Sequence, residues 1–155
     1  MKHTVLTAAL VAGLTSPLAA QEMINASNAL DVLVAVRDLG YRATLEKDSV
    51  DDPMISSKAS GLNYVILFYG CTDHQNCQSL QFSSSFDLTD GTTAEAMNAW
   101  NNENRYGRAY IDENNDPVIR YEFNMVGVGI SKEVFNDNFE IWESLLNDFK
   151  IHINF

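Results

Sequence analysis

Residues 62–69 read LNYVILFY, and residues 79–88 read SLQFSSSFDL. The second stretch alternates between apolar and polar side chains, which is the period-two pattern of a strand with one buried face. The first stretch is apolar on both faces, so we expect a central strand whose second face must be covered by a helix or by another subunit. The short polar segment between the two strands predicts an antiparallel hairpin.

The two cysteines of the chain, Cys71 and Cys77, lie in the loop of this predicted hairpin. An even pair at short spacing is typical of a disulfide in an oxidising compartment, and paired strand ends bring Cα atoms within its reach. A metal site is an alternative, because His74 completes a Cys-x-x-His-x-x-Cys arrangement suited to copper or zinc. An exchanging redox pair is another. We expect the disulfide, since only three metal ligands are present locally and thiols in an oxidising compartment tend to oxidise.

The beginning of the chain has the pattern of a secretory signal peptide. An apolar run at 5–14 follows a short positive stretch, and small residues lead to an expected cleavage point after Ala20. The run is shorter than the ~20 apolar residues of a membrane-spanning helix. We therefore expect a signal peptide at 1–20, a short N-terminal segment at 21–27 and a single domain at 28–155. The protein is then periplasmic or secreted, with no stable membrane anchoring.

The chain is strongly acidic. Its 155 residues include 21 acidic and 10 basic side chains, which give a net charge of −11. Removal of residues 1–20 takes away one lysine and no acid, so 9 basic side chains then face 21 acidic ones. Phosphate backbones and anionic lipid surfaces would repel such a protein, so we do not expect it to bind nucleic acid.

Periodicity and capping residues predict the remaining elements. Helices are expected at 28–39, at 93–104 after a capping box of Thr92 with Glu95, and from Ser131 to about 153. Further strands are expected at 41–46, 54–57, 107–112 and 118–125.

The resulting order is α-β-β-β-β-α-β-β-α, with strands grouped in hairpins rather than separated by crossover helices. This order predicts an α+β domain with an antiparallel sheet and helices packed on one face. An acidic turn ending in Asp-Pro occurs twice, at Asp52-Pro53 and at Asp116-Pro117. A shared turn geometry and an internal duplication explain this repeat equally well.

No catalytic constellation emerges, so we expect neither an enzyme nor a cofactor. Asp112, Asn114 and Asp116 imitate the first positions of a calcium loop, but Pro117 stands where that loop requires glycine. A hairpin turn is the favoured interpretation. The serine run at 83–85 lacks the glycines of a nucleophile elbow, and histidines are too few for a triad.

Four residues are candidates for a surface that binds a partner or ligand: Trp100, Arg105, Arg108 and Arg120. The arginines lie near tyrosines and suit a carboxylate or the acidic tail of a partner. The alternative is that they pair with the chain's own acids. For Trp100, a core position and an interface anchor are the two interpretations.

Four segments resemble the YbjN family of bacterial sensory transduction regulators. They are 68–71 (FYGC), 77–82 (CQSLQF), 98–101 (NAWN) and 105–111 (RYGRAYI), and the resemblance covers nearly all of 28–150. It implies a fold similar to that of type III secretion chaperones, which is a small α+β domain that commonly dimerises and binds other proteins. It implies no established enzymatic activity.

Two functional hypotheses follow. The first is an exported, non-enzymatic protein-interaction module, chaperone-like or regulatory, that forms a homodimer and binds a protein partner that the sequence does not identify. The second is a periplasmic ligand or metal binder. It would use either the loop of Cys71, His74 and Cys77 or the cluster of Arg105, Arg108 and Arg120.

Overall fold

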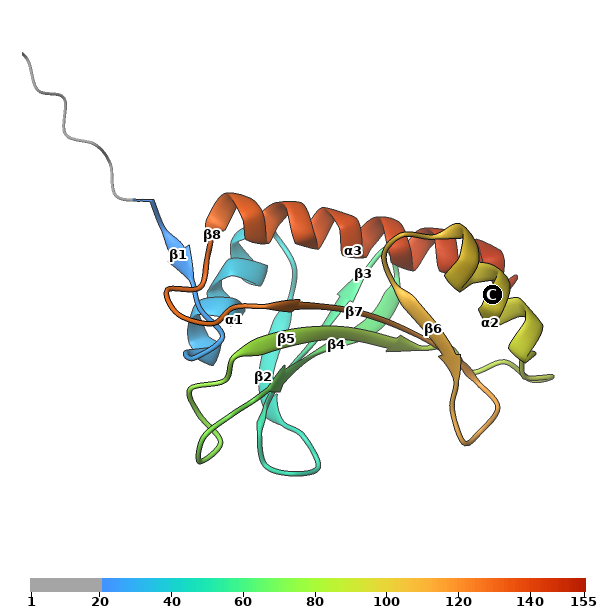
Figure 1. Cartoon of the computed structure of the whole chain (residues 1–155), viewed down its shortest axis with the longest axis horizontal. Coiled ribbons are helices and arrows are strands. Elements are labelled where there is room, and N and C mark those ends of the chain that lie inside the picture. The colour runs from blue at the N-terminus through green and yellow to red at the C-terminus, as the bar shows by residue number, and fades with distance from the viewer. Residues whose placement is uncertain (1–20) are drawn as a thin grey trace, which may run out of the picture.

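Six antiparallel strands form one sheet in the computed structural model, which describes residues 21–155. In order across the sheet they are β2 (Ala43–Lys47), β3 (Pro53–Ala59), β4 (Leu62–Tyr69), β5 (Ser79–Ser85), β7 (Pro117–Asn124) and β6 (Arg108–Ile111). The three helices of the described residues lie on one face of this sheet (Figure 1). They are α1 (Ala29–Asp38), α2 (Ala94–Glu103) and α3 (Lys132–His152). The predicted α+β class is confirmed.

The predicted hairpin of β4 and β5 forms the middle of the sheet. Tyr69 at the end of β4 pairs with Ser79 at the start of β5, and β4 is also paired with β3 on its other side. Alternate side chains of β4 are buried beneath the helices, from Leu62 to Phe68. The expectation of a central strand at 62–69 is confirmed.

A single stripe of large side chains on α3 packs into the core. Phe135, Phe139, Trp142, Leu146 and Phe149 recur at steps of four and three, so they lie on one face of the helix, and all are buried. The Phe139 and Trp142 rings lie 6.0 and 5.5 Å from the ring of Phe82 on β5. Burying one such side chain contributes roughly 1.5–3 kcal/mol, so this stripe fixes α3 on the sheet.

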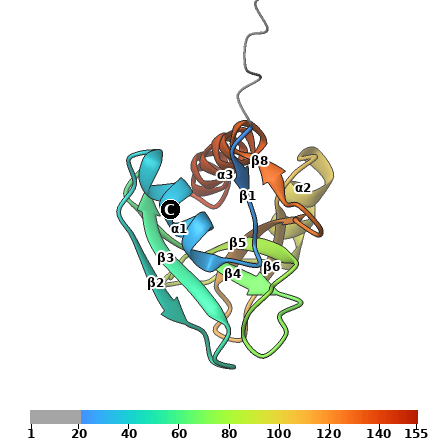
Figure 2. The ribbon, with the colours of Figure 1, turned by 90° about the vertical axis from the view of Figure 1, so that its left-hand side faces the viewer.

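The two shorter helices cover the ends of the same face. Figure 2 shows α1 and α2 on either side of α3, all above the sheet. Helix α2 buries only Met97 and Trp100, as its polar sequence predicts, and the Trp100 ring lies 5.0 Å from Phe149 of α3. Helix α1 buries an apolar stripe that includes Val32 and Val36.

A small second sheet adds two strands to the predicted order. Strand β1 (Met23–Ile24) pairs with β8 (Ile130–Ser131). Gly129 permits this pairing, because its φ is +82° and a Cβ atom there would lie 2.1 Å from the carbonyl oxygen of Ile24. Strands of two residues are too short to show a period-two pattern, so periodicity does not predict them. The signal peptide predicted at 1–20 lies outside the described residues.

The N-cap of α2 differs from the prediction by one residue. Thr93 is the cap, and its hydroxyl accepts a hydrogen bond from the first turn of the helix at 3.2 Å. Thr92 instead donates its backbone N–H to Asn115 in the turn between β6 and β7. The capping box of Thr92 and Glu95 is therefore wrong, whereas Ser131 caps α3 as predicted.

The two acidic turns share one geometry. Between β2 and β3, the Asp48 carboxylate accepts hydrogen bonds at 2.9 and 3.0 Å from the backbone N–H groups two and four residues further on. Between β6 and β7, Asp112 does the same at 2.9 and 3.0 Å. Asp112 is therefore used by the turn, which supports the hairpin interpretation over the calcium loop.

The substitution Asp112→Ala tests this turn. We expect it to lower the free energy of unfolding by about 1–2 kcal/mol, because two backbone N–H groups lose their acceptor. Urea unfolding measures the change. The control is Asp87→Ala, which removes the same charge from an exposed side chain. Equal effects of the two substitutions would show that charge, rather than the turn, sets the difference.

Candidate functional site

One face of the six-stranded sheet has no helix over it among residues 21–155 (Figures 1 and 2). We call it the open face. Its side chains alternate with the buried ones, so on β4 it is formed by Asn63, Val65, Leu67 and Tyr69, together with their neighbours on adjoining strands. The sequence led us to expect that a helix or another subunit covers the second face of β4. Among the described residues, no helix covers it.

One half of the open face is an apolar strip formed by Met54, Val65, Leu67 and Tyr69. Met54 lies directly opposite Leu67 across the β3–β4 pair. Tyr69 is 43% exposed. Adjacent apolar side chains on an uncovered sheet face are typical of a surface that contacts another molecule.

The other half of the open face carries Arg108 and Arg120, which form the arginine cluster together with Arg105 at the β6 edge of the sheet. Arg108 on β6 and Arg120 on β7 are direct cross-strand partners, and Arg105 lies in the loop that precedes β6. The three line one hollow of about 390 Å³. The structure thus brings together the three arginines that the sequence singles out. Like charges directly opposite each other on neighbouring strands are destabilising, so an anion beside Arg108 and Arg120 would stabilise the pair.

The cluster has little compensating charge among the described residues. Arg108 Nη2 lies 3.7 Å from Glu122 Oε2, and both side chains are more than half exposed, so this ion pair is weak. The buried Nε of Arg120 has no hydrogen-bond partner within residues 21–155. The Arg120 guanidinium lies over the Tyr110 ring, with 4.7 Å between Cζ and the ring centroid. Among the described residues, only Arg108 of the three arginines thus pairs with an acid, and that pair is weak.

Charge is segregated over the whole open face. Five of the nine basic side chains of residues 21–155 lie on it or line its hollows, against two acidic side chains. The basic ones are Arg42, Lys58, Arg105, Arg108 and Arg120, and the acidic ones are Glu46 and Glu122. The open face is thus a positive region in an acidic protein.

Sequence reasoning did not identify Arg42 and Lys58 as part of this surface. They line a larger hollow of about 860 Å³, together with Ser56, Ser83 and other polar side chains. Ser83 is the cross-strand partner of Arg120, so this hollow adjoins the arginine cluster. Only the strand order reveals this proximity, because on its other side β5 pairs with β7 and not with β6, which is the next strand in the sequence.

A row of hydrogen bonds links the apolar strip to the arginine cluster. The Tyr69 hydroxyl donates to Gln81 on β5 at 3.5 Å, and the amide of Gln81 donates to Glu122 on β7. Glu122 in turn is the ion-pair partner of Arg108. Glu122 is therefore held by the sheet as well as by the arginine.

Trp100 does not belong to the surface. It is 2% exposed, and its indole N–H donates to the carbonyl oxygen of Gly107 at 2.9 Å. The prediction of Trp100 as a surface residue is therefore wrong, because its ring fills the core between α2 and α3. Its neighbour Asn101 has a role that the sequence did not suggest. The Asn101 side chain donates to Ala109 O at 2.9 Å and accepts from Ala109 N–H at 2.8 Å, so it replaces a neighbouring strand at the edge of β6.

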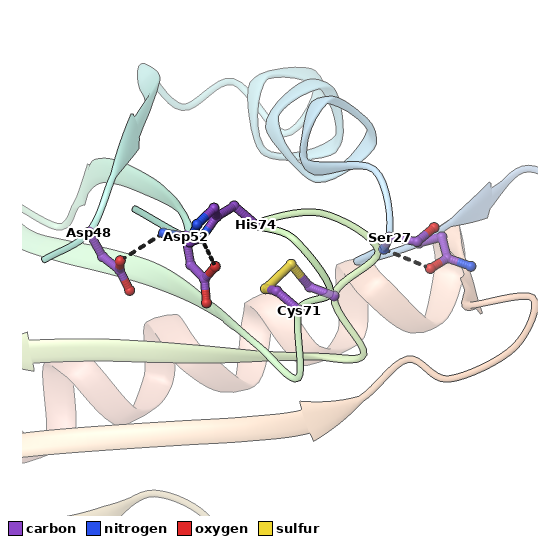
Figure 3. Close-up of a disulfide and its surroundings, with 7 residues drawn as sticks. Ser27, Asp48, Asp52, Cys71 and His74 are labelled. Atoms are coloured by element: carbon purple, nitrogen blue, oxygen red, sulfur yellow. Dashed lines mark hydrogen bonds and ion pairs between the residues drawn. A yellow bond between two sulfur atoms is a disulfide. The ribbon is translucent and has the colours of Figure 1, made fainter. Parts of the chain in front are cut away.

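The cysteine loop has a structural arrangement. Cys71 and Cys77 are joined by a disulfide, which ties the end of β4 to the start of β5. Figure 3 shows His74 beside this disulfide and directed toward Asp52, where Nδ1 lies 2.8 Å from Oδ1. Within residues 21–155, no three histidine, cysteine or acidic side chains are grouped as a metal site would require. The metal alternative for Cys71, His74 and Cys77 therefore gains no support.

Tyrosines beside the two hollows hold their protons. Burial raises the pKa of Tyr64 to about 12, and burial together with the hydrogen bond to Glu143 raises the pKa of Tyr41 to about 12. Burial also raises the pKa of Tyr121, beside the arginine cluster. At neutral pH these phenols are uncharged and add no negative charge beside the two hollows.

Comparison with known proteins agrees with the resemblance seen in the sequence. The family model YbjN, described as "Putative bacterial sensory transduction regulator", matches residues 28–155. The matched range contains the whole six-stranded sheet and its three helices. No curated protein and no solved structure matches the chain. None of the helices within residues 21–155 combines the length and apolar character needed to cross a bilayer.

The substitution Asn101→Ala tests how the edge of the arginine cluster is held. Ala109 is 4% exposed, so its N–H and carbonyl groups would lose their partners where little water can replace them. We expect the free energy of unfolding to fall by about 1–3 kcal/mol and the Ala109 amide to exchange faster with solvent. The control is Asn98→Ala, at an exposed position of the same helix. Unchanged exchange at Ala109 would contradict the assignment.

Proposed function

The chain belongs to the YbjN family, and from this premise we propose that it is an exported, non-enzymatic regulatory module that binds another protein through the open face. The observation that carries the proposal is the asymmetry of the sheet. All three helices of the described residues pack on one side, while the other side combines an apolar strip with a basic half. A face of this composition is better suited to contact with another protein than to exposure to water.

We propose further that the module is a homodimer in which the apolar strip supplies the contact between subunits. Val65 and Leu67 are apolar side chains on the uncovered face of β4. This strand lies between β3 and β5, so these side chains are not at the edge of the sheet. A second copy would provide the cover that β4 requires. The basic half would then remain beside the dimer contact for a protein partner, as in a chaperone-like binding surface.

Export is proposed from two independent features. The residues up to Ala20 have the pattern of a cleaved signal peptide. The disulfide of Cys71 and Cys77 is a bond that persists in oxidising compartments and is rare in the reducing cytosol. A periplasmic or secreted location suits both.

A non-enzymatic role is proposed because no nucleophile, base and oxyanion donor are grouped within the described residues. Ser84, in the serine run, donates its hydroxyl to the backbone oxygen of Asn63 at 2.7 Å and faces the core side of the sheet. His74 is paired with Asp52, and His152 contacts the backbone of Ala96. These side chains serve the fold.

Photo-crosslinking in a bacterial host tests the proposal. A benzophenone-bearing phenylalanine replaces Tyr69 on the open face in one variant and Ile151 on α3 in another. Both native side chains are exposed, at 43% and 77%. We expect adducts from position 69, including one of twice the mass of the chain, and none from position 151. Mass spectrometry of each adduct separates the homodimer from a complex with another protein.

The proposal would be overturned by adducts that form only from position 151, or by their absence from both positions. A self-adduct without any second protein would support the homodimer and contradict binding of a partner. Because Ile151 is the more exposed of the two, accessibility alone favours the control, so a signal confined to position 69 reports a specific contact.

A further inference from the structure

We propose that the arginine cluster of Arg105, Arg108 and Arg120 binds carboxylate side chains of an acidic segment in the partner protein. This inference rests on the proposed function, since it assigns the chemistry of the partner that the open face binds. It concerns the basic half of that face, which is distinct from the apolar strip.

The first argument is the unequal distribution of charge. The described residues hold 21 acidic side chains, enough to pair every basic one, yet the three arginines share only Glu122 within hydrogen-bond or ion-pair range. Elsewhere Lys47 and Lys132 have acidic partners, whereas Arg37, Arg42, Lys58 and Lys150 have none within residues 21–155. What distinguishes the arginine cluster is that three guanidinium groups line one hollow and share a single weak ion pair. A cluster left short of anions in so acidic a chain is suited to an anion from another molecule.

The second argument is the local geometry. Arg108 and Arg120 are directly opposite on adjoining strands, so their repulsion is relieved when an anion lies between them. The Nε of Arg120 has no hydrogen-bond partner within residues 21–155, so no acid of these residues is bound to it. Guanidinium groups also present two parallel N–H donors, which match the two oxygens of a carboxylate.

The third argument concerns the size of the ligand. The hollow at the arginines is open, and the larger hollow lined by Arg42 and Lys58 adjoins it through the Ser83–Arg120 pair. A small molecule is usually enclosed on most sides by its site. Basic side chains spread over two adjoining open hollows instead suit an extended peptide that carries several carboxylates.

The negative net charge of the protein favours a short acidic peptide over a long polyanion as the ligand. Nucleic acid would bring many phosphates close to the acidic remainder of the molecule and be repelled. An acidic peptide segment needs to meet only the open face, because charges farther than about 8 Å are largely screened at physiological ionic strength.

The experiment uses the purified chain and fluorescently labelled hexaglutamate as the probe, followed by fluorescence anisotropy. The test variant carries Arg108→Gln and Arg120→Gln, and a second variant carries the exposed Arg105→Gln alone. The matched control is Lys150→Gln on α3, which removes one positive charge on the helix side and has no ion-pair partner within residues 21–155. Thermal unfolding of every variant verifies the fold.

We expect hexaglutamate to bind, hexaglutamine not to bind, and the affinity to fall as salt is raised from about 50 to about 300 mM. The double variant should lose at least about tenfold in affinity, as expected for the loss of charge-assisted hydrogen bonds, and Arg105→Gln should lose less. Lys150→Gln should bind as the unsubstituted chain does. If the double variant unfolds, Arg105→Gln still decides the outcome.

Three results would overturn the inference: arginine variants that bind with unchanged affinity, an equal loss in Lys150→Gln, or inorganic phosphate that displaces the peptide at equal charge concentration. The last would make the cluster a simple anion site. Repeating the Tyr69 crosslinking in the double variant separates this inference from the proposed function. An unchanged partner adduct would reject the arginine cluster as the docking site while leaving partner binding intact.

Discussion

The packing of α3 on one face of the sheet is the constraint on which the rest of the structure depends. One stripe of aromatic and aliphatic side chains buries Trp142 and Phe139 against the sheet, and α2 joins the same core through Trp100. Because these three helices all use the same face, the opposite face has no helical cover within residues 21–155. The open face is therefore a consequence of where the core lies, and its side chains are set by strand alternation.

The open face joins two kinds of contact in one surface. The apolar strip around Leu67 suits a second copy of the chain, while the arginine cluster suits carboxylates. Trp100 and Asn101 connect this surface to the core, because they bind the backbone at Gly107 and Ala109 on either side of Arg108. Trp100 and Asn101 thus help to fix the backbone on either side of Arg108. The negative charge of the remaining surface repels anions, so attraction for anions is confined to one side of the molecule.

Much of the fold could be predicted from local patterns, and most of the site could not. The α3 stripe, the central strand at 62–69 and the Ser131 cap all follow from periodicity and capping, which act within a few residues. The pairing of β5 with β7 places Ser83 beside Arg120, and it depends on contacts distant in sequence. Trp100 shows the same limit, since its apolar spacing allows both a core and a surface position, and only the packing against Phe149 decides between them.

The most direct test of the account is a measurement of contacts between chains in solution. Isotope-labelled and unlabelled copies of the purified chain are mixed, and intermolecular nuclear Overhauser effects to methyl groups are recorded. The account predicts such effects at Val65 and Leu67 on the open face, with none at Val134 and Ile151, which are exposed at 47% and 77% on α3. Intermolecular effects confined to Val134 and Ile151, or a chain that shows none at any methyl group, would contradict it.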